Sequence, residues 1–324
     1  MIRLALLSGG RSGEHEISVR SAKSVREALD PGKYTVLDYF IGKDGKWTPG
    51  PILPEPGANP GIDVVFPLLH GTFGEDGTVQ GLLELAELPY VGAGVLGSAA
   101  SMDKAVAKRL CQDAGLPVVP HSVLLQGEFD PSALTLPFGY PVFVKPANLG
   151  SSVGITKVKS PDGLRAALDT AFRFDRKVVL EQGVQGREFE CAVLGGAKPR
   201  ASTPCEILPS QDFYTYDDKY LLDKARIELP ANITAQQTSE MQALAVACFS
   251  AMECEGMGRV DFLMDGVTGK FYINEINTIP GFTSISMYPK MWEYSGVPYP
   301  VLLDTLIGLA LERAKTRRLL QYSL

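Results

Sequence analysis

The chain has 324 residues, which suggests roughly two domains, and its 45% apolar content is typical of a protein with a sizeable core. Its 31 basic and 37 acidic residues give a net charge of −6, and this balance argues against a nucleic-acid-binding protein, which normally carries a basic face. Five scattered cysteines, none in a C-x-x-C pair, argue against a disulfide framework or a zinc ribbon and predict reduced thiols in a cytoplasmic protein. No apolar run approaches the roughly 18 residues of a membrane span, and the N-terminus lacks the features of a signal peptide.

Strand and helix patterns alternate over about the first hundred residues. An apolar run at 2–7 stops at Gly9-Gly10, which predicts a buried strand that enters a tight loop. Further strand patterns lie at 34–41 and 64–69, and helical spacing occurs at 17–29 and 79–88. Because strands alternate with helices, this part of the chain is expected to form a parallel, doubly wound α/β sheet.

The pattern changes after residue 103. A helix is expected at 104–114, ended by Gly115 and Pro117. Strand-like segments then recur at 140–145, 154–158, 178–181 and 188–194. A single helical pattern, at 160–172, separates the first two strands from the last two. This spacing favours an antiparallel sheet in an α+β domain. The last third contains three more strand patterns, at 225–229, 258–264 and 271–276. It also contains two long helical patterns, at 235–252 and 299–318.

A lysine followed by a glycine-rich loop is the first candidate for a functional site. From Lys145 to Gly154 the chain reads KPANLGSSVG, so an expected strand ends in lysine and a small, hydroxyl-rich loop leads into the next strand. Such a loop can direct several backbone N–H groups at one anion, and the lysine adds a full positive charge. The pattern matches neither the P-loop nor the dinucleotide-binding fingerprint. By itself it is compatible with a phosphate-binding loop or with an ordinary turn.

Two successive expected strands carry a stronger signal, GRVD at 258–261 and NEIN at 274–277. Alternation along each strand puts Arg259 and Asp261 on one face, and Glu275 and Asn277 on one face of the next strand. An antiparallel hairpin would bring these faces together, and such hard oxygen ligands suit Mg²⁺ bridged by substrate phosphates. The alternative is a solvated sheet face with alternating charges, which the apolar residues between them disfavour. The Pro280-Gly281 turn directly afterwards could expose backbone N–H groups to a developing oxyanion.

These residues resemble the ATP-grasp superfamily, and within it the D-alanine–D-alanine ligase family. The resemblance is an ordered series that extends along nearly the whole chain. Its members are Gly9-Gly10, Ser12, Glu14, Glu16-Ile17-Ser18, His70-Gly71, Gly74 to Gly81, Tyr90-Val91-Gly92, Met102-Asp103-Lys104, Val144-Lys145-Pro146, Gly150 to Gly154, Phe213-Tyr214, Lys219-Tyr220, Gly258 to Asp261, Asn274 to Thr278 and Pro280-Gly281.

The resemblance implies a three-domain ATP-grasp architecture. An N-terminal parallel α/β domain at 1–103 would hold the first D-alanine, and two α+β domains at 104–199 and 200–324 would enclose ATP. The expected activity is the ATP-dependent joining of two D-alanines through a D-alanyl phosphate, for peptidoglycan precursor synthesis. The implied cofactors are ATP and two Mg²⁺ (or Mn²⁺) ions. The expected partners are small-molecule substrates, without nucleic acid or membrane, and analogy implies a cytoplasmic homodimer.

The resemblance also implies roles for individual residues. The expected nucleotide-binding residues are Lys104, Lys145, Ser152, Glu181, Glu188, Lys219 and Asn274, with Glu181 at adenine and Glu188 at the ribose. The expected metal ligands are Asp261, Glu275 and Asn277. The expected catalytic residues are Glu14, Ser151, Tyr220, Arg259, Gly281 and His70. Within that set, Glu14 would anchor the ammonium of the first D-alanine and bond to Ser151 and Tyr220, and Arg259 with the Gly281 N–H would form an oxyanion hole.

Ser286 and Met287 are the residues expected at the second substrate. Ser286 would bind its carboxylate, and Met287 offers an apolar contact that suits a methyl group but no hydrogen bond for a serine hydroxyl. D-Ala-D-Ser or D-Ala-D-lactate synthesis remains the alternative within the family. The alternative from another class of protein is a nucleotide-binding regulatory protein that has the same fold but no turnover. Many relatives have Glu-Lys where this chain has Glu181-Gln182. This departure puts one side-chain contact to the nucleotide in doubt.

Overall fold

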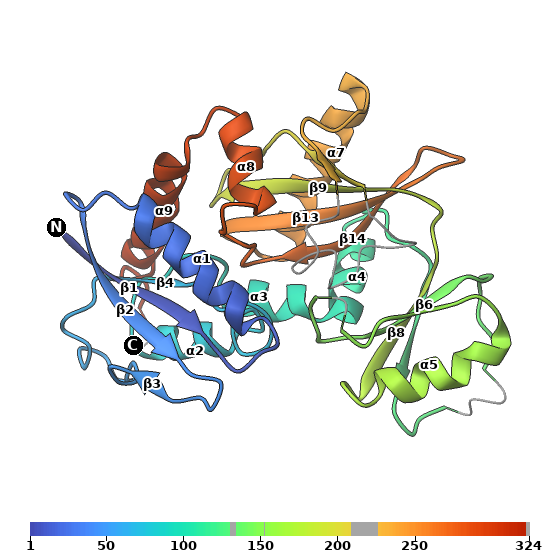
Figure 1. The fold of residues 1–324 in the computed structure, drawn as a ribbon, viewed down its shortest axis with the longest axis horizontal. Helices are drawn as coiled ribbons and strands as arrows, with labels where there is room; N and C mark the ends of the chain where they lie inside the picture. Colours follow the sequence, from blue (N-terminus) through green and yellow to red (C-terminus); the bar gives the residue numbers. More distant parts are fainter. Residues whose placement is uncertain (130–133, 152, 209–225, 322–324) are drawn as a thin grey trace.

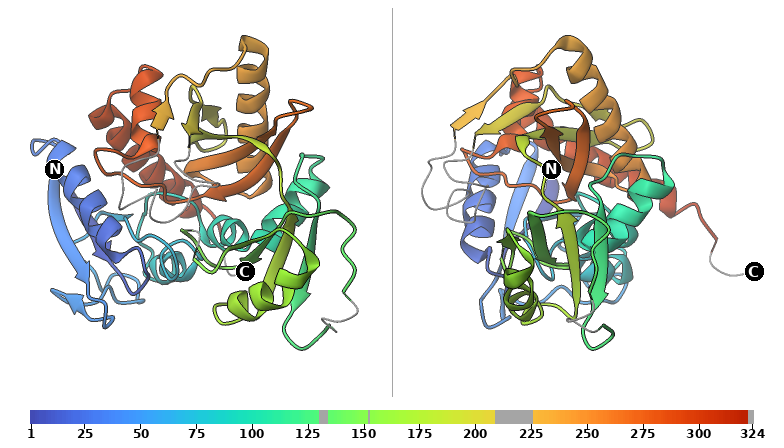
Figure 2. Two further views of the ribbon diagram at one scale, coloured as in Figure 1. Left: turned by 45° about the vertical axis from the view of Figure 1, so that its right-hand side comes forward. Right: turned by 90° about the vertical axis from the view of Figure 1, so that its right-hand side faces the viewer.

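The computed structural model describes residues 1–129, 134–151, 153–208 and 226–321, which form three β-sheets with helices packed against them (Figure 1). In Figure 1 and in the left view of Figure 2 the first sheet lies on one side, the second on the other, and the third above and between them. This arrangement decides which side chains can meet at one place.

The N-terminal unit is the parallel α/β sheet that the alternating pattern predicts. Strands β1 (Ile2–Gly9), β2 (Tyr34–Ile41) and β4 (Val64–Pro67) are parallel, and the short β3 (Trp47–Thr48) adds an antiparallel edge in the order β3-β2-β1-β4. The helices are α1 (His15–Ala28), α2 (Thr78–Leu85) and α3 (Val95–Met102). Gly9 ends β1 at φ +90°, and a Cβ there would lie 2.2 Å from the Ile41 carbonyl oxygen, so the loop requires glycine.

The second sheet is antiparallel throughout, as the sequence predicts for an α+β unit. It contains β5 (His121–Leu125), β6 (Val142–Pro146), β7 (Thr156–Val158) and β8 (Lys177–Gln182) in the order β5-β8-β6-β7. The 3₁₀ turn η1 (Pro161–Gly163) leads into α5 (Leu164–Ala171), whose buried residues pack on the sheet. Helix α4 (Lys104–Asp113) joins this unit to α3. The sequence pattern missed β5, which is only partly buried.

The third sheet has the order β12-β11-β9-β13-β14, with β10 paired to β9. Its strands are β9 (Gly186–Gly195), β10 (Arg200–Ala201), β11 (Cys205–Leu208), β12 (Arg226–Glu228), β13 (Gly256–Asp265) and β14 (Phe271–Asn277). Helix α7 (Ala235–Ala251) packs against it, and α8 (Met287–Tyr294) and α9 (Tyr299–Arg317) share a core with β1, β4 and β9. The N-terminal and third units are therefore joined by buried apolar residues.

Sheet membership changes between β8 and β9. Strand β9 pairs along its whole length with β13, although the expected central domain at 104–199 includes it. We propose that the second and third domains divide near Gly183 and that the N-terminal domain spans residues 1–103.

No single helix in the described ranges is long and apolar enough to cross a membrane. Helices α8 and α9 together reach such a length and apolar content only as a pair bent by 106°, and one side of each helix is buried in the core. All five cysteines are buried and free.

Candidate active site

Two adjoining cavities lie where the three units meet. The first, of about 300 Å³, lies between the N-terminal unit and the third sheet, and the second, of about 390 Å³, lies between the second and third sheets. Both are lined by Lys104, Gly150, Ser151, Glu190 and Glu275. A group bound in one cavity can therefore meet a group bound in the other across these shared residues.

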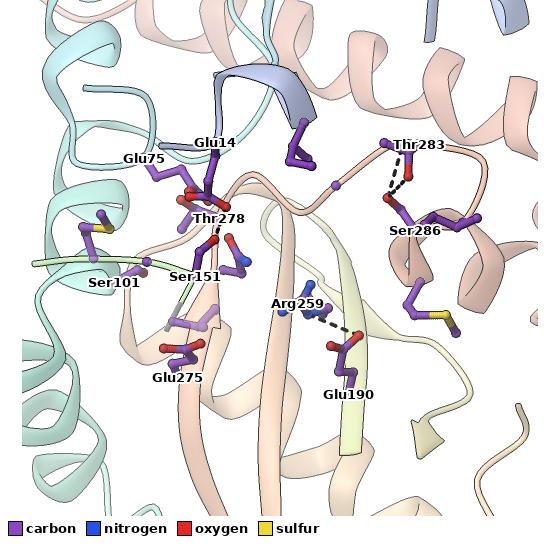
Figure 3. Close-up of a pocket in the computed structure, with 18 of the residues that line it drawn as sticks. Glu14, Glu75, Ser101, Ser151, Glu190, Arg259, Glu275, Thr278, Thr283 and Ser286 are labelled. Atoms are coloured by element: carbon purple, nitrogen blue, oxygen red, sulfur yellow. Dashed lines mark hydrogen bonds and ion pairs between the residues drawn. The ribbon is translucent and has the colours of Figure 1, made fainter. Parts of the chain in front are cut away.

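The β13–β14 hairpin forms the wall between the cavities, as the alternation predicts. Arg259 pairs with Asn277 and Asp261 with Glu275, so all four lie on one face. Arg259 donates from Nε and Nη2 to the two Asp261 carboxylate oxygens, each at 2.7 Å, and its Nε lies 3.4 Å from Glu190 on β9 (Figure 3). Asp261 also lies opposite Glu190 in the β9–β13 pairing. Three carboxylates and one guanidinium thus converge at this wall.

Lysines approach the second cavity from α4 and β6. Lys104 donates to the Leu149 carbonyl at 2.7 Å, and its Nζ lies 3.5 Å from Glu275. Lys145 donates to Glu181 at 2.7 Å and to the Asn274 side-chain oxygen at 3.3 Å. This cavity is lined by Lys104, Lys145, Glu181, Glu188 and Asn274. The expected nucleotide-binding residues in the described part of the chain therefore lie together.

Glu181 is engaged more fully than the sequence indicates. Its second carboxylate oxygen lies 3.1 Å from Nζ of Lys108, a buried lysine to which the sequence pattern gives no role. Burial by itself raises the pKa of Glu181, but Lys108 and Lys145 outweigh it and lower the pKa to about 2. The one available signal for Lys108 is its position four residues after Lys104, which puts both on one face of α4.

A hydrogen bond joins the N-terminal unit to the glycine-rich loop. Ser151, in the left-handed region at φ +53°, donates its hydroxyl to Glu14 (Figure 3). Glu75 lies beside Glu14 in the first cavity and accepts N–H bonds from Gly71 at 2.6 Å and Ile279 at 3.3 Å. Burial, and then the Glu14 charge, raise the pKa of Glu75 to about 8. Glu75 belongs to the motif at 74–81, but no separate role was expected for it from the sequence.

His70 is buried behind the cavity wall. It lines neither cavity in the described ranges, and its ring nitrogens lie 2.9 Å from the Ile279 carbonyl and 3.0 Å from the Ser21 hydroxyl. Burial lowers the pKa of His70, which favours the neutral ring. The contacts with Ile279 and Ser21 hold the His70 ring against the segment that leads to Gly281, and the catalytic role expected for His70 stays a prediction.

The expected residues for the second substrate lie at the far end of the first cavity. A Cβ on Gly281 would lie 2.7 Å from the Ser286 hydroxyl oxygen, so the two residues are in close contact. Ser286 precedes α8 and accepts a hydrogen bond from the Thr283 N–H at 3.0 Å (Figure 3). Met287 is buried, and it both lines the cavity and packs in the core.

Part of the expected site lies outside the described residues, namely Ser152, Lys219 and Tyr220, and so do Phe213 and Tyr214 of the family motifs. Within the described part no group of three or more His, Cys, Asp and Glu side chains is arranged to hold a metal ion on its own. Two carboxylates and an amide on neighbouring strands are nevertheless hard oxygen donors that suit Mg²⁺ once phosphate oxygens complete the coordination.

Two antiparallel sheets enclose a cavity with buried lysines on one side and carboxylates on the other, and this arrangement defines an ATP-grasp enzyme. Comparison with known proteins agrees. The family model for the D-ala D-ala ligase C-terminus matches residues 110–308, and the model for the N-terminus matches 3–61 and 53–93. The chain belongs to the D-alanine–D-alanine ligase family.

Individual relatives cover almost the whole chain. A D-alanine–D-alanine ligase of Solibacter usitatus is 59% identical, covering 99% of each chain, and D-alanine–D-alanine ligase A of Bradyrhizobium diazoefficiens is 48% identical over 99% of this chain and 98% of its own. Among solved structures, the D-alanine–D-alanine ligase from Coxiella burnetii superposes with a TM-score of 0.87 at 37% identity, covering 98% and 96% of the two chains. The VanG D-Ala:D-Ser ligase from Enterococcus faecalis also superposes with a TM-score of 0.87, at 35% identity, covering 95% of this chain and 99% of its own.

Proposed function

We propose that this D-alanine–D-alanine ligase activates the carboxylate of one D-alanine with ATP and joins it to the amine of a second, as in peptidoglycan precursor synthesis. The observation that carries the proposal is the pair of adjoining cavities, which share Lys104, Ser151 and Glu275. One cavity has the charge pattern for a polyphosphate, and the other has carboxylate and hydroxyl groups for small zwitterions. Their junction is where a phosphoryl group would pass from one substrate to the other.

The first step needs two anions to approach each other. A carboxylate is a poor electrophile, so its attack on the γ-phosphate of ATP, with release of ADP, converts it to an acyl phosphate with a good leaving group. In this proposal Lys104, Lys145 and the loop at 150–154, with Ser152, hold the phosphates, because ammonium and N–H groups offset their charge. Glu181, Glu188, Lys219 and Asn274 bind the rest of the nucleotide. Glu14 receives the ammonium of the first D-alanine, and Ser151 and Tyr220 hold Glu14.

In the second step the amine of the second D-alanine attacks the acyl phosphate through a tetrahedral oxyanion. Arg259 and the Gly281 N–H stabilise this oxyanion, which collapses with loss of phosphate. Ser286 binds the second carboxylate, while Met287 contacts the methyl group. His70 supports Gly281 through Ile279, whose carbonyl lies 2.9 Å from the His70 ring. Water must be excluded, because an acyl phosphate hydrolyses readily.

We propose that Asp261, Glu275 and Asn277 hold two Mg²⁺ (or Mn²⁺) ions with ATP. When bound, the ions would neutralise charge on the phosphates and orient them. The support is the donor set itself, with Asp261 opposite Glu275 and with Asn277 two residues further along the same strand. We also propose a cytoplasmic homodimer, by analogy with the family.

The second substrate is the point at which the family diverges, since one structural neighbour is a D-Ala:D-Ser ligase. Met287 favours D-alanine because a thioether gives no strong hydrogen bond to a hydroxyl group, although such a pocket rejects D-serine by only about one to two orders of magnitude. The test is product identification with equimolar D-alanine, D-serine and D-lactate at neutral pH. Mainly D-Ala-D-Ala is expected, and a majority of either other product would overturn the proposal. Absence of phosphate release with ATP, Mg²⁺ and D-alanine would favour a regulatory protein.

A further inference from the structure

Lys108 occupies an unusual position for a lysine. Its side chain is 2% exposed on α4, one helical turn after Lys104, and it lines neither cavity in the described part of the chain. Asp103 fixes the start of α4 by accepting N–H bonds from Ala105 and Val106, each at 3.1 Å. Burying an ammonium group is strongly unfavourable unless the group is paired with an anion. Burial lowers the pKa of Lys108, and the adjacent Glu181 opposes that effect.

Two ammonium groups share a single carboxylate beneath the second cavity. Lys145 lies 2.7 Å from one oxygen of Glu181, and Lys108 lies 3.1 Å from the other. The same two lysines converge on Asn274: Lys145 donates to its side-chain oxygen at 3.3 Å and Lys108 to its carbonyl at 3.4 Å. Glu181 and Lys145 line the cavity, and Lys108 lies behind them.

Lys108, Lys145 and Glu181 form one cluster of charges, and its net charge depends on Lys108. Lys145 with Glu181 alone would form a neutral pair, and the ammonium of Lys145 would be directed to the carboxylate. With Lys108 protonated, the cluster carries a net charge of +1, and the ammonium group of Lys108 pairs with the Glu181 oxygen that faces away from Lys145. We infer that Lys108 is a positioning residue for the nucleotide: it compensates Glu181, so that the charge of Lys145 remains available to the phosphate groups in the cavity. This inference rests on the assignment of that cavity to ATP.

The experiment compares ADP binding by calorimetry, without D-alanine, and KM for ATP in Lys108→Met, Glu181→Gln and the double variant. Lys108→Met leaves Lys145 paired to Glu181 and should weaken ADP binding and raise KM for ATP by about tenfold, with KM for D-alanine within about twofold of wild type. In the double variant Lys145 keeps its charge, so ADP affinity should recover to well above that of Lys108→Met. A purely structural contact predicts a double variant at least as impaired as Lys108→Met.

A matched control is available in an ion pair that anchors the start of α4 from strand β8. Lys177 forms an ion pair with Asp103 at the start of α4 but lines neither cavity within the described ranges. Lys177→Met therefore loosens α4 without changing the charge beneath the nucleotide, and its ADP affinity should stay within about twofold of wild type. Equal losses in Lys177→Met and Lys108→Met, unchanged ADP binding in Lys108→Met, or no recovery in the double variant would each overturn the inference. If wild type binds ADP but does not turn over D-alanine, the proposed function fails while this comparison still decides the role of Lys108.

Discussion

Asp261 and Glu275 are direct cross-strand partners, with Arg259 bonded to both oxygens of Asp261. Like charges directly opposite each other destabilise a sheet. The guanidinium group offsets this repulsion in the structure, and Lys104 lies 3.5 Å from Glu275 on the other side. Such a pair is typical of a site that is completed by a cation.

Glu275→Gln should therefore lose turnover without losing the fold. We expect phosphate release at saturating Mg²⁺ to fall about a hundredfold or more, since a bound metal ion contributes several kcal/mol to the transition state. The melting temperature without Mg²⁺ should stay close to wild type. Glu240→Gln, on the exposed side of α7, is the control and should retain full turnover. Near-normal activity of Glu275→Gln would remove the metal assignment.

Lys145→Met tests the phosphate site directly. Its ammonium lies at the end of β6 beside the glycine-rich loop, where it acts as a point charge. We expect KM for ATP to rise or phosphoryl transfer to slow by about tenfold or more, measured by calorimetry and turnover. The exposed Lys198→Met is the control. If both measurements stay at wild-type values, the loop at 145–154 is only a turn.

Gly281→Ala tests the contact with Ser286. An added Cβ would lie 2.7 Å from the Ser286 hydroxyl oxygen and must displace it from Thr283. KM for the second D-alanine should rise by about tenfold, one hydrogen bond to a charged group being worth about 1.5–3 kcal/mol, with little change in KM for ATP. Gly61→Ala, where a Cβ meets no atom within 4 Å, should behave as wild type. An equal rise in both KM values would indicate a general disturbance instead.

Glu75 gives a prediction for the pH dependence of stability. Burial and the Glu14 charge raise its pKa to about 8 in the folded protein, against about 4.3 in an unfolded chain. Between these values the unfolded chain is ionised at Glu75 and the folded protein is protonated, so folding takes up a proton and stability falls as pH rises.

Relative to Glu75→Gln, wild type should therefore lose up to ~1.4 kcal/mol of unfolding free energy per pH unit between about pH 5 and pH 8. Denaturant unfolding of both proteins across this range measures the difference. Titrations common to the two proteins, such as that of His70, cancel in the comparison. A difference that is constant with pH would show that the Glu75 carboxyl group is ionised in the folded protein.

Met287→Arg tests second-substrate specificity. The side chain of Met287 lines the first cavity next to Ser286, so arginine would add hydrogen-bond donors that a serine hydroxyl can use. We expect the product ratio to shift toward D-Ala-D-Ser, within the one to two orders of magnitude that such pockets discriminate. Met287→Leu keeps an apolar contact and should keep D-Ala-D-Ala as the main product. An unchanged ratio in Met287→Arg would show that specificity is set elsewhere.

The sequence alone determined the features that depend on local periodicity and spacing. Alternation over 258–261 and 274–277 predicted a hairpin face that carries Arg259, Asp261, Glu275 and Asn277, and the observed pairing confirms it. The helix–strand alternation before residue 103 likewise predicted a parallel sheet. Strand faces and parallel crossovers follow from short-range backbone geometry, and the spacing of apolar and polar residues in the sequence reflects that geometry.

Tertiary structure decided which charges meet. Lys108 and Glu181 are 73 positions apart in the numbering, and no pattern in either segment shows that α4 brings Nζ to within 3.1 Å of the carboxylate. Glu75 owes its raised pKa to burial beside Glu14, and His70 lies behind the cavity with its ring 2.9 Å from the Ile279 carbonyl oxygen. Burial and long-range electrostatics arise only when the units pack together, so they decided the state and role of these groups where the sequence could indicate only their identity.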